Sequence, residues 1–146
     1  MFRFADIGRL WVPMTLPLGE EGEQPEVWLL LEVFTSKELR EREATAMQAA
    51  TAHLGADADT ATAALSLLED IEATGRADLL ARTHDWRQVA DDEGQPVPFD
   101  RNKLAALLES PLWFAAQRNA LYDASRNGVR KNFKPGPAGT PARVQA

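Results

Sequence analysis

Residues 26–38 of the chain are EVWLLLEVFTSKE, and this stretch predicts both a strand and the helix that follows it. Its first part, residues 26–35, is dense in valine, tryptophan, leucine and phenylalanine, which favour strands. Thr35 is followed three residues later by Glu38, the spacing of a capping box, in which hydroxyl and carboxylate each accept from a backbone amide. We therefore expect a helix over residues 36–53 directly after the strand.

A partner strand is expected earlier in the chain, over residues 10–18. Apolar side chains alternate there with the period of a half-buried strand, at Val12, Met14, Leu16 and Leu18. Pro13 and Pro17 have no amide hydrogen to donate, which favours an edge position. The acidic, turn-rich residues 19–25 then join the two strands into a β-hairpin.

The middle of the chain has helical periodicity. A second helix, expected to end near Gly75, presents one face traced by Ala64, Leu65, Leu68, Ile71 and Glu72. A short third helix is expected over residues 77–82. Asp100 is a natural N-cap for a helix over residues 101–109, which places Leu104, Leu107 and Leu108 at helical spacing.

The last predicted helix begins at Ser110 and Pro111, since serine caps helices and proline is tolerated at their first position. It should run to about Asn127 and be closed by Gly128. Residues 133–146 are rich in proline and glycine and predict a disordered tail.

These patterns together predict an α+β fold that is predominantly α. It comprises an N-terminal β-hairpin (residues 10–18 and 26–35), a bundle of four to five helices and the disordered C-terminal tail. A chain of 146 residues with 45% hydrophobic and 26% charged residues is typical of one globular domain, here residues 1–132.

Composition narrows the class of partner. The chain has no cysteine, and its apolar runs, such as residues 27–31, are far too short to span a bilayer, so we expect neither disulfides nor a membrane association. All 22 acidic residues but only 11 of the 16 basic ones lie at or before Asp123. An acidic body followed by a short basic tail disfavours nucleic acid binding.

Catalytic motifs are missing from the sequence. His53 and His84 are 31 residues apart without spaced metal-ligating partners, and no glycine-rich phosphate-binding motif occurs. His84 and Asp85 could form a dyad, but adjacent residues of a helix point to different faces. We therefore expect no enzyme activity, no cofactor and no metal site.

An unusual stretch, residues 86–99, places apolar side chains on both sides of an acidic turn. Gly94 can adopt the positive φ that closes such a turn, and Pro96 and Pro98 keep the return extended. Trp86, Val89, Val97 and Phe99 are then expected to fold onto the helices. These four side chains either anchor the fold or contact a partner. Anchoring is the more common role of buried aromatic residues in loops.

Weaker candidates for partner contact lie on the last helix, at Trp113, Phe114, Leu121 and Tyr122. Their spacing produces two apolar faces rather than one. Either one face is available to a partner or a second subunit, or both are buried within the domain.

The order of these motifs resembles the tail assembly chaperones of long-tailed, siphophage-type bacteriophages. That family commonly carries a tryptophan, an acidic turn with glycine, a proline-phenylalanine pair, a leucine-rich helix and a final lysine-asparagine. The matching residues here are Trp86, Val89, Asp91, Gly94, Pro98, Phe99, Leu104, Leu107, Leu108, Pro111, Lys131 and Asn132. The resemblance covers about residues 9–132. The sequence departs from the family pattern at the alanine-rich residues 56–64 and in the C-terminal tail.

The resemblance implies a non-enzymatic chaperone that binds the tape measure protein in the host cytoplasm, keeps it soluble and promotes polymerisation of tail tube protein around it. Weak self-association and absence from the mature virion are further expectations. In that family a longer product arises by ribosomal frameshifting, which would extend the chain at its C-terminal tail. The alternatives are a structural tail or head-completion protein that stays in the virion, and a small hydrolase using His84 and Asp85.

Overall fold

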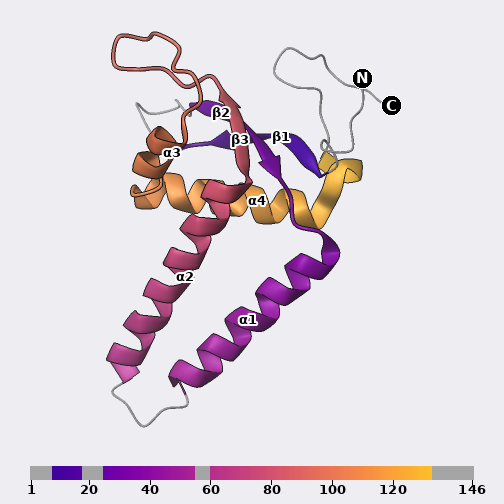
Figure 1. Ribbon diagram of the computed structural model, residues 1–146, viewed down its shortest axis with the longest axis vertical. Coiled ribbons are helices and arrows are strands. Elements are labelled where there is room, and N and C mark those ends of the chain that lie inside the picture. The colour runs from indigo at the N-terminus through magenta and orange to yellow at the C-terminus, as the bar shows by residue number, and fades with distance from the viewer. Residues whose placement is uncertain (1–7, 18–24, 55–59, 133–146) are drawn as a thin grey trace.

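The computed structural model describes residues 8–17, 25–54 and 60–132 (Figure 1). Within these ranges the elements are β1 (Arg9–Thr15), β2 (Glu26–Glu32), α1 (Ser36–Leu54), α2 (Thr60–Arg82), β3 (Thr83–Arg87), α3 (Arg101–Leu107) and α4 (Pro111–Asn132). The predicted α+β, mainly helical class is confirmed. The predicted tail, residues 133–146, lies outside the described residues.

The N-terminal hairpin is present and belongs to a three-stranded antiparallel sheet in the order β1-β2-β3. β1 lies at an edge, as its prolines predicted, and Val12 pairs with Leu29. β1 ends at Thr15 and β2 at Glu32, so both strands are shorter than predicted, and Leu18 is outside the described residues. β2 stops early because Thr35 is needed as the cap of α1.

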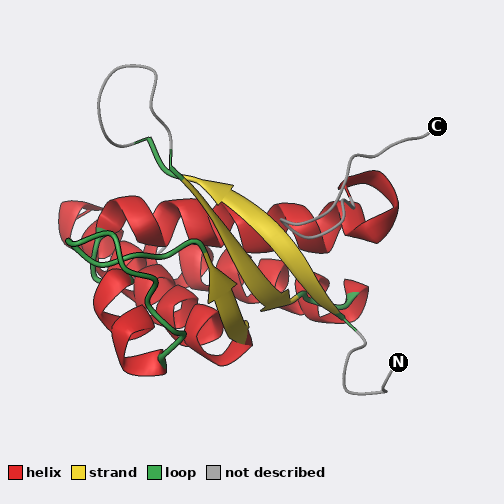
Figure 2. Ribbon diagram, turned by 90° about the horizontal axis from the view of Figure 1, so that it is seen from above, coloured by secondary structure: helices red, strands yellow, loops and turns green. Residues whose placement is uncertain are grey.

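The third strand, β3, was not predicted. It pairs with β2 from Trp28↔Arg87 to Leu31↔Thr83, with an irregularity in register between Leu30 and Leu31. The segment is short and polar, so its strand conformation depends on the open edge of β2 rather than on its own pattern. One face of the sheet packs on α4, and the strands cross the helix obliquely (Figure 2).

The capping box of α1 is confirmed. The Glu38 amide donates to Thr35 Oγ1 at 3.1 Å, and the Thr35 amide donates to Glu38 Oε1 at 2.9 Å. Asp100 likewise caps α3 by accepting from the Asn102 amide at 3.4 Å. Leu104 and Leu108 on the following turns are buried in the core.

The prediction that one helix ends near Gly75 and another spans residues 77–82 is wrong. α2 is continuous from Thr60 to Arg82, and Gly75 lies in its interior. A Cβ at Gly75 would come within 2.8 Å of Phe114 Cζ. Glycine at this position therefore allows α2 to approach α4 closely and does not terminate the helix.

The predicted end of the last helix is also wrong, because α4 continues through Gly128 to Asn132. A glycine inside a helix costs only about 1 kcal/mol relative to alanine, so its presence alone does not stop a helix. The predicted start at Pro111 is confirmed, with the Trp113 amide donating to Ser110 Oγ at 3.4 Å.

The described residues divide into a body and an arm (Figure 1). We define the arm as α1 together with residues 60–78 of α2, which project from the sheet as an antiparallel pair. The body is the remainder, and it contains the apolar core, whose largest fully buried side chains are Leu29, Leu31, Leu79, Leu104, Leu108 and Leu121. A buried polar chain crosses this core from Trp113 Nε1 to Gln117 Oε1 (2.8 Å) and from Gln117 Nε2 to Thr83 Oγ1 (2.7 Å).

Candidate partner-binding surface

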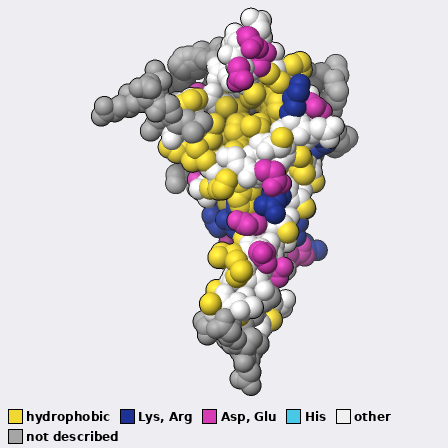
Figure 3. Space-filling model, turned by 90° about the vertical axis from the view of Figure 1, so that its left-hand side faces the viewer, with side chains coloured by type: hydrophobic (Ala, Val, Ile, Leu, Met, Phe, Trp, Pro, Cys, Tyr) yellow, Lys and Arg dark blue, Asp and Glu magenta, His cyan; other side chains and the backbone are white. Residues whose placement is uncertain are grey.

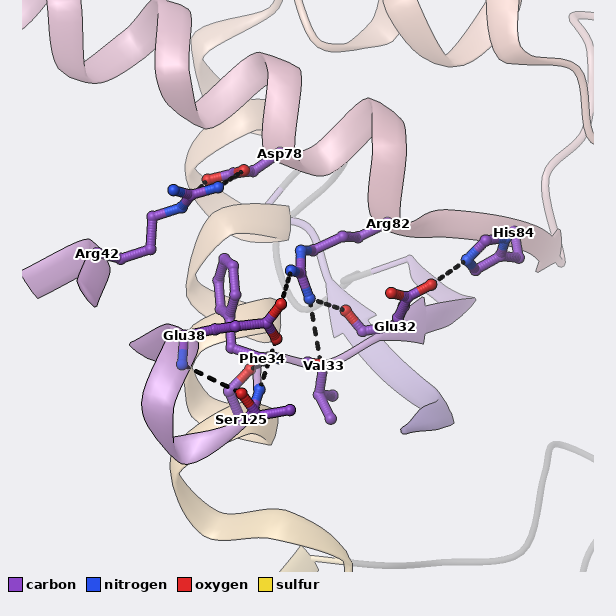
Figure 4. A network of polar contacts seen from close by, with 10 residues as sticks. Glu32, Val33, Phe34, Glu38, Arg42, Asp78, Arg82, His84 and Ser125 are labelled. Atoms are coloured by element: carbon purple, nitrogen blue, oxygen red, sulfur yellow. Dashed lines mark hydrogen bonds and ion pairs between the residues drawn. The ribbon is translucent and has the colours of Figure 1, made fainter. Parts of the chain in front are cut away.

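A network of polar contacts joins the arm to the body (Figure 4). Arg82, the last residue of α2, donates through Nη1 to the carbonyl oxygens of Glu32 and Val33, each at 3.2 Å. Its Nη2 donates to Glu38 Oε2 at 3.1 Å, and its Cζ lies 4.1 Å from the centre of the Phe34 ring. One guanidinium therefore holds the end of β2, the start of α1 and the end of α2 together.

A second arginine connects the two arm helices one turn further out. Arg42 Nε and Nη2 donate to the two carboxylate oxygens of Asp78 at 2.9 and 2.6 Å. The hydrogen bond with Asp78 raises the pKa of Arg42 above its ordinary value. Because bidentate pairing fixes the relative orientation of two side chains, these contacts set the angle between α1 and α2 at the base of the arm.

The outer parts of the two arm helices are uncharged and weakly packed. Residues 44–52 of α1 and 60–68 of α2 contain no acidic or basic residue. Ala63 is the one arm residue that is buried within the described chain. The three large apolar side chains that are most exposed all lie here, namely Met47 (72%), Leu65 (58%) and Leu68 (57%).

Charged residues begin where this apolar end stops. Glu69 and Glu72 lie on the exposed side of α2 next to Leu68. Seen from the side of α2, hydrophobic atoms along the lower arm give way to acidic and basic groups nearer the body (Figure 3). The arm thus presents an apolar surface bordered by acidic side chains, and such surfaces mark sites of protein interaction.

The contact candidates predicted on α4 occupy different places. Trp113 and Leu121 are buried in the core, while Phe114 and Tyr122 are half-buried against it. The Tyr122 ring lies 5.4 Å from the Phe34 ring, and Phe114 packs against Gly75. Tyr122 also lines a hollow of about 130 Å³ at the base of the arm, between α1, α2 and α4. These four side chains therefore lie in the core or between the body and the arm, and they do not form an open surface.

The stretch from Trp86 to Phe99 folds back on itself at the edge of the body. Trp86 is buried, its Nε1 donates to the Val97 carbonyl at 2.7 Å, and the Phe99 ring meets it edge-on at 5.1 Å. Gly94 has φ +80°, and Val89 packs against the core. Pro98 is exposed. Trp86 therefore lies inside the fold with Phe99 half-buried beside it, and the acidic turn of residues 91–94 is exposed.

His84 and Asp85 lie on β3, so the helical position that was assumed for them is wrong. His84 Nε2 is 3.0 Å from Glu32 Oε1, and Asp85 Oδ1 accepts from the Trp86 amide at 2.8 Å. These two side chains are used in contacts within the sheet. Within the described ranges, no group of three or more histidine, cysteine, aspartate or glutamate residues is placed to hold a metal ion.

None of the helices in the described part of the chain combines the length and apolar character that crossing a membrane requires.

Comparison with known proteins identifies no similar protein. No protein-family model matches the sequence, and no curated protein or solved structure is significantly similar to it. Met47 and Glu69 are not singled out by the sequence patterns above, although the run over residues 44–52 contains no charged residue.

Proposed function

We propose that this protein is a non-enzymatic chaperone of phage tail assembly. In this proposal it binds the tape measure protein in the host cytoplasm, keeps it soluble and promotes polymerisation of the tail tube around it. The ordered motifs from Trp86 to Asn132 support the family, and the exposed end of the arm supports the activity.

The observation that carries the proposal is the exposure of Met47, Leu65 and Leu68 on the uncharged outer parts of the two helices of a projecting arm (Figure 1). An apolar helical client can lay its side chains along such a surface and so remove them from water. The chain as a whole has a net charge of −6, which keeps a complex with an apolar client from associating further. The arm is therefore the proposed client-binding element, and the body is the support that holds it.

Co-expression with the tape measure protein of the same phage tests this proposal. The wild-type chain is expected to move most of the tape measure protein into the soluble fraction. The triple variant Met47→Ser, Leu65→Ser, Leu68→Ser should lose this effect. The matched variant Met47→Leu, Leu65→Met, Leu68→Met should keep it, because it retains apolar side chains at the same positions.

An equally insoluble tape measure protein with and without the wild-type chain would contradict the proposal. Mass spectrometry of purified phage particles provides a second test, because a chaperone of assembly should be absent from them. Recovery of the protein from the particles would instead indicate a structural tail or head-completion protein.

A further inference from the structure

The outer side of α2 carries a continuous stripe of four exposed residues, Leu65, Leu68, Glu69 and Glu72. Their spacing is i, i+3, i+4 and i+7, which places them on one face of the helix. We call these four residues the outer stripe. Two leucines at its far end are followed directly by two carboxylates, so the stripe is apolar at one end and acidic at the other.

The outer stripe points away from the rest of the molecule. The opposite face of α2 carries Ala63, which is buried, and Asp78, which pairs with Arg42 of α1. Gly75 faces α4 through Phe114. The contacts of α2 within the chain thus use its other faces and leave the stripe to solvent.

The two carboxylates of the stripe have no ion-pair partner among the described residues. No hydrogen bond or salt bridge is formed by the side chain of Glu69 or Glu72 within those ranges, and Arg76 lies one turn beyond, half-buried. A helix lying along the stripe would bring its own side chains next to both the leucines and these charges. Complementarity then requires apolar side chains opposite Leu65 and Leu68 and cationic ones opposite Glu69 and Glu72.

We propose that the outer stripe of α2 binds an amphipathic helix of the client in which apolar side chains are followed, one turn along, by lysine or arginine. This inference rests on the proposed function, because it specifies the kind of client segment that the arm accepts. A second copy of the chain is a poorer occupant, since its own stripe would bring a further pair of carboxylates to this surface.

Two synthetic 18-residue peptides test the inference with the full-length protein. Both carry the same leucine and alanine stripe, and they differ only in having two lysines or two glutamates one turn beyond it. The lysine peptide is expected to bind roughly threefold to tenfold more tightly at low salt, as two exposed ion pairs allow. This preference should shrink as sodium chloride is raised, because salt screens exposed charges.

Two charge variants locate the effect. Glu69→Gln with Glu72→Gln should abolish the preference for the lysine peptide. Asp92→Asn with Glu93→Gln removes the same net charge from an exposed turn of the body and should leave the preference intact. Leu65→Ser with Leu68→Ser should weaken binding of both peptides.

Equal binding of the two peptides at low salt would overturn the inference, as would an equal loss of preference in both charge variants. A leucine variant that turns a dimer into a monomer in sedimentation, with no change in peptide binding, would show that a second copy occupies the stripe. Failure here differs from failure of the proposed function. If the wild-type chain keeps the tape measure protein soluble but binds the two peptides equally, only the charge requirement is refuted and the proposed function stands.

Discussion

The body and the arm use apolar residues in opposite ways. In the body, leucines from the sheet, α2, α3 and α4 fill a common core, and Leu29, Leu31 and Leu104 are fully buried. In the arm, Leu65 and Leu68 are more than half exposed, and Ala63 is the one buried residue in the described part. Helices gain most of their stability from tertiary packing, so the arm depends on its base and on whatever covers its far end.

The same substitution made in each region gives the largest expected contrast. Leu29→Ala on β2 removes a fully buried side chain and leaves a cavity, which should lower the free energy of unfolding by about 2–5 kcal/mol. Leu65→Ala on the arm should change it by no more than about 0.5 kcal/mol, since the side chain is already largely in water. Urea denaturation measures both. A similar loss in the two variants would show that the arm is packed in solution.

A smaller effect is expected from the polar chain inside the body. Gln117→Leu leaves the buried Trp113 Nε1 without its acceptor and should cost about 1–3 kcal/mol of unfolding free energy. In a Trp113→Phe background the same change should cost less, because no indole N–H is then left unpaired. A double-mutant cycle by urea denaturation measures this coupling, and additive losses would argue against the bond.

The smallest expected effect lies at the joint between the two regions and depends on pH. The hydrogen bond from the Thr35 amide, and then the Arg82 guanidinium, lower the pKa of Glu38 below its ordinary value of 4.5. The charged carboxylate therefore stabilises the start of α1 at pH values above 4.5, and this contribution is lost as pH falls through the lowered pKa.

NMR titration of the Glu38 side chain and the Thr35 amide measures this effect. Amide protection in the first turn of α1 should fall on acidification before the core of the body unfolds. Glu38→Gln is the matched control and should make the protection of that turn insensitive to pH over the same range. A Glu38 pKa at or above 4.5 in the wild-type protein would contradict the hydrogen bonds of this carboxylate with the Thr35 amide and Arg82.

Several elements were predictable because their signals are local. The capping box of Thr35 and Glu38, the cap at Asp100 and the alternation that leads into Met14 depend on residues a few positions apart. The continuation of α2 past Gly75 and the pairing of β3 were not predictable in this way. A glycine that ends a helix and one that admits a neighbouring ring look the same in sequence, and only the position of Phe114 distinguishes them.

The candidate surface likewise depends partly on local sequence signals and partly on tertiary packing. The sequence by itself determined that Leu65 and Leu68 lie on one face of a helix, and that no charged residue occurs over residues 44–52, because both follow from spacing and composition. Tertiary structure alone decided that this face meets solvent while Trp113 and Leu121 are covered. The physical reason is that periodicity specifies which side chains share a face of a helix, whereas the burial of that face depends on which other element packs against it. In this protein the Arg42 and Arg82 contacts direct the arm away from the body.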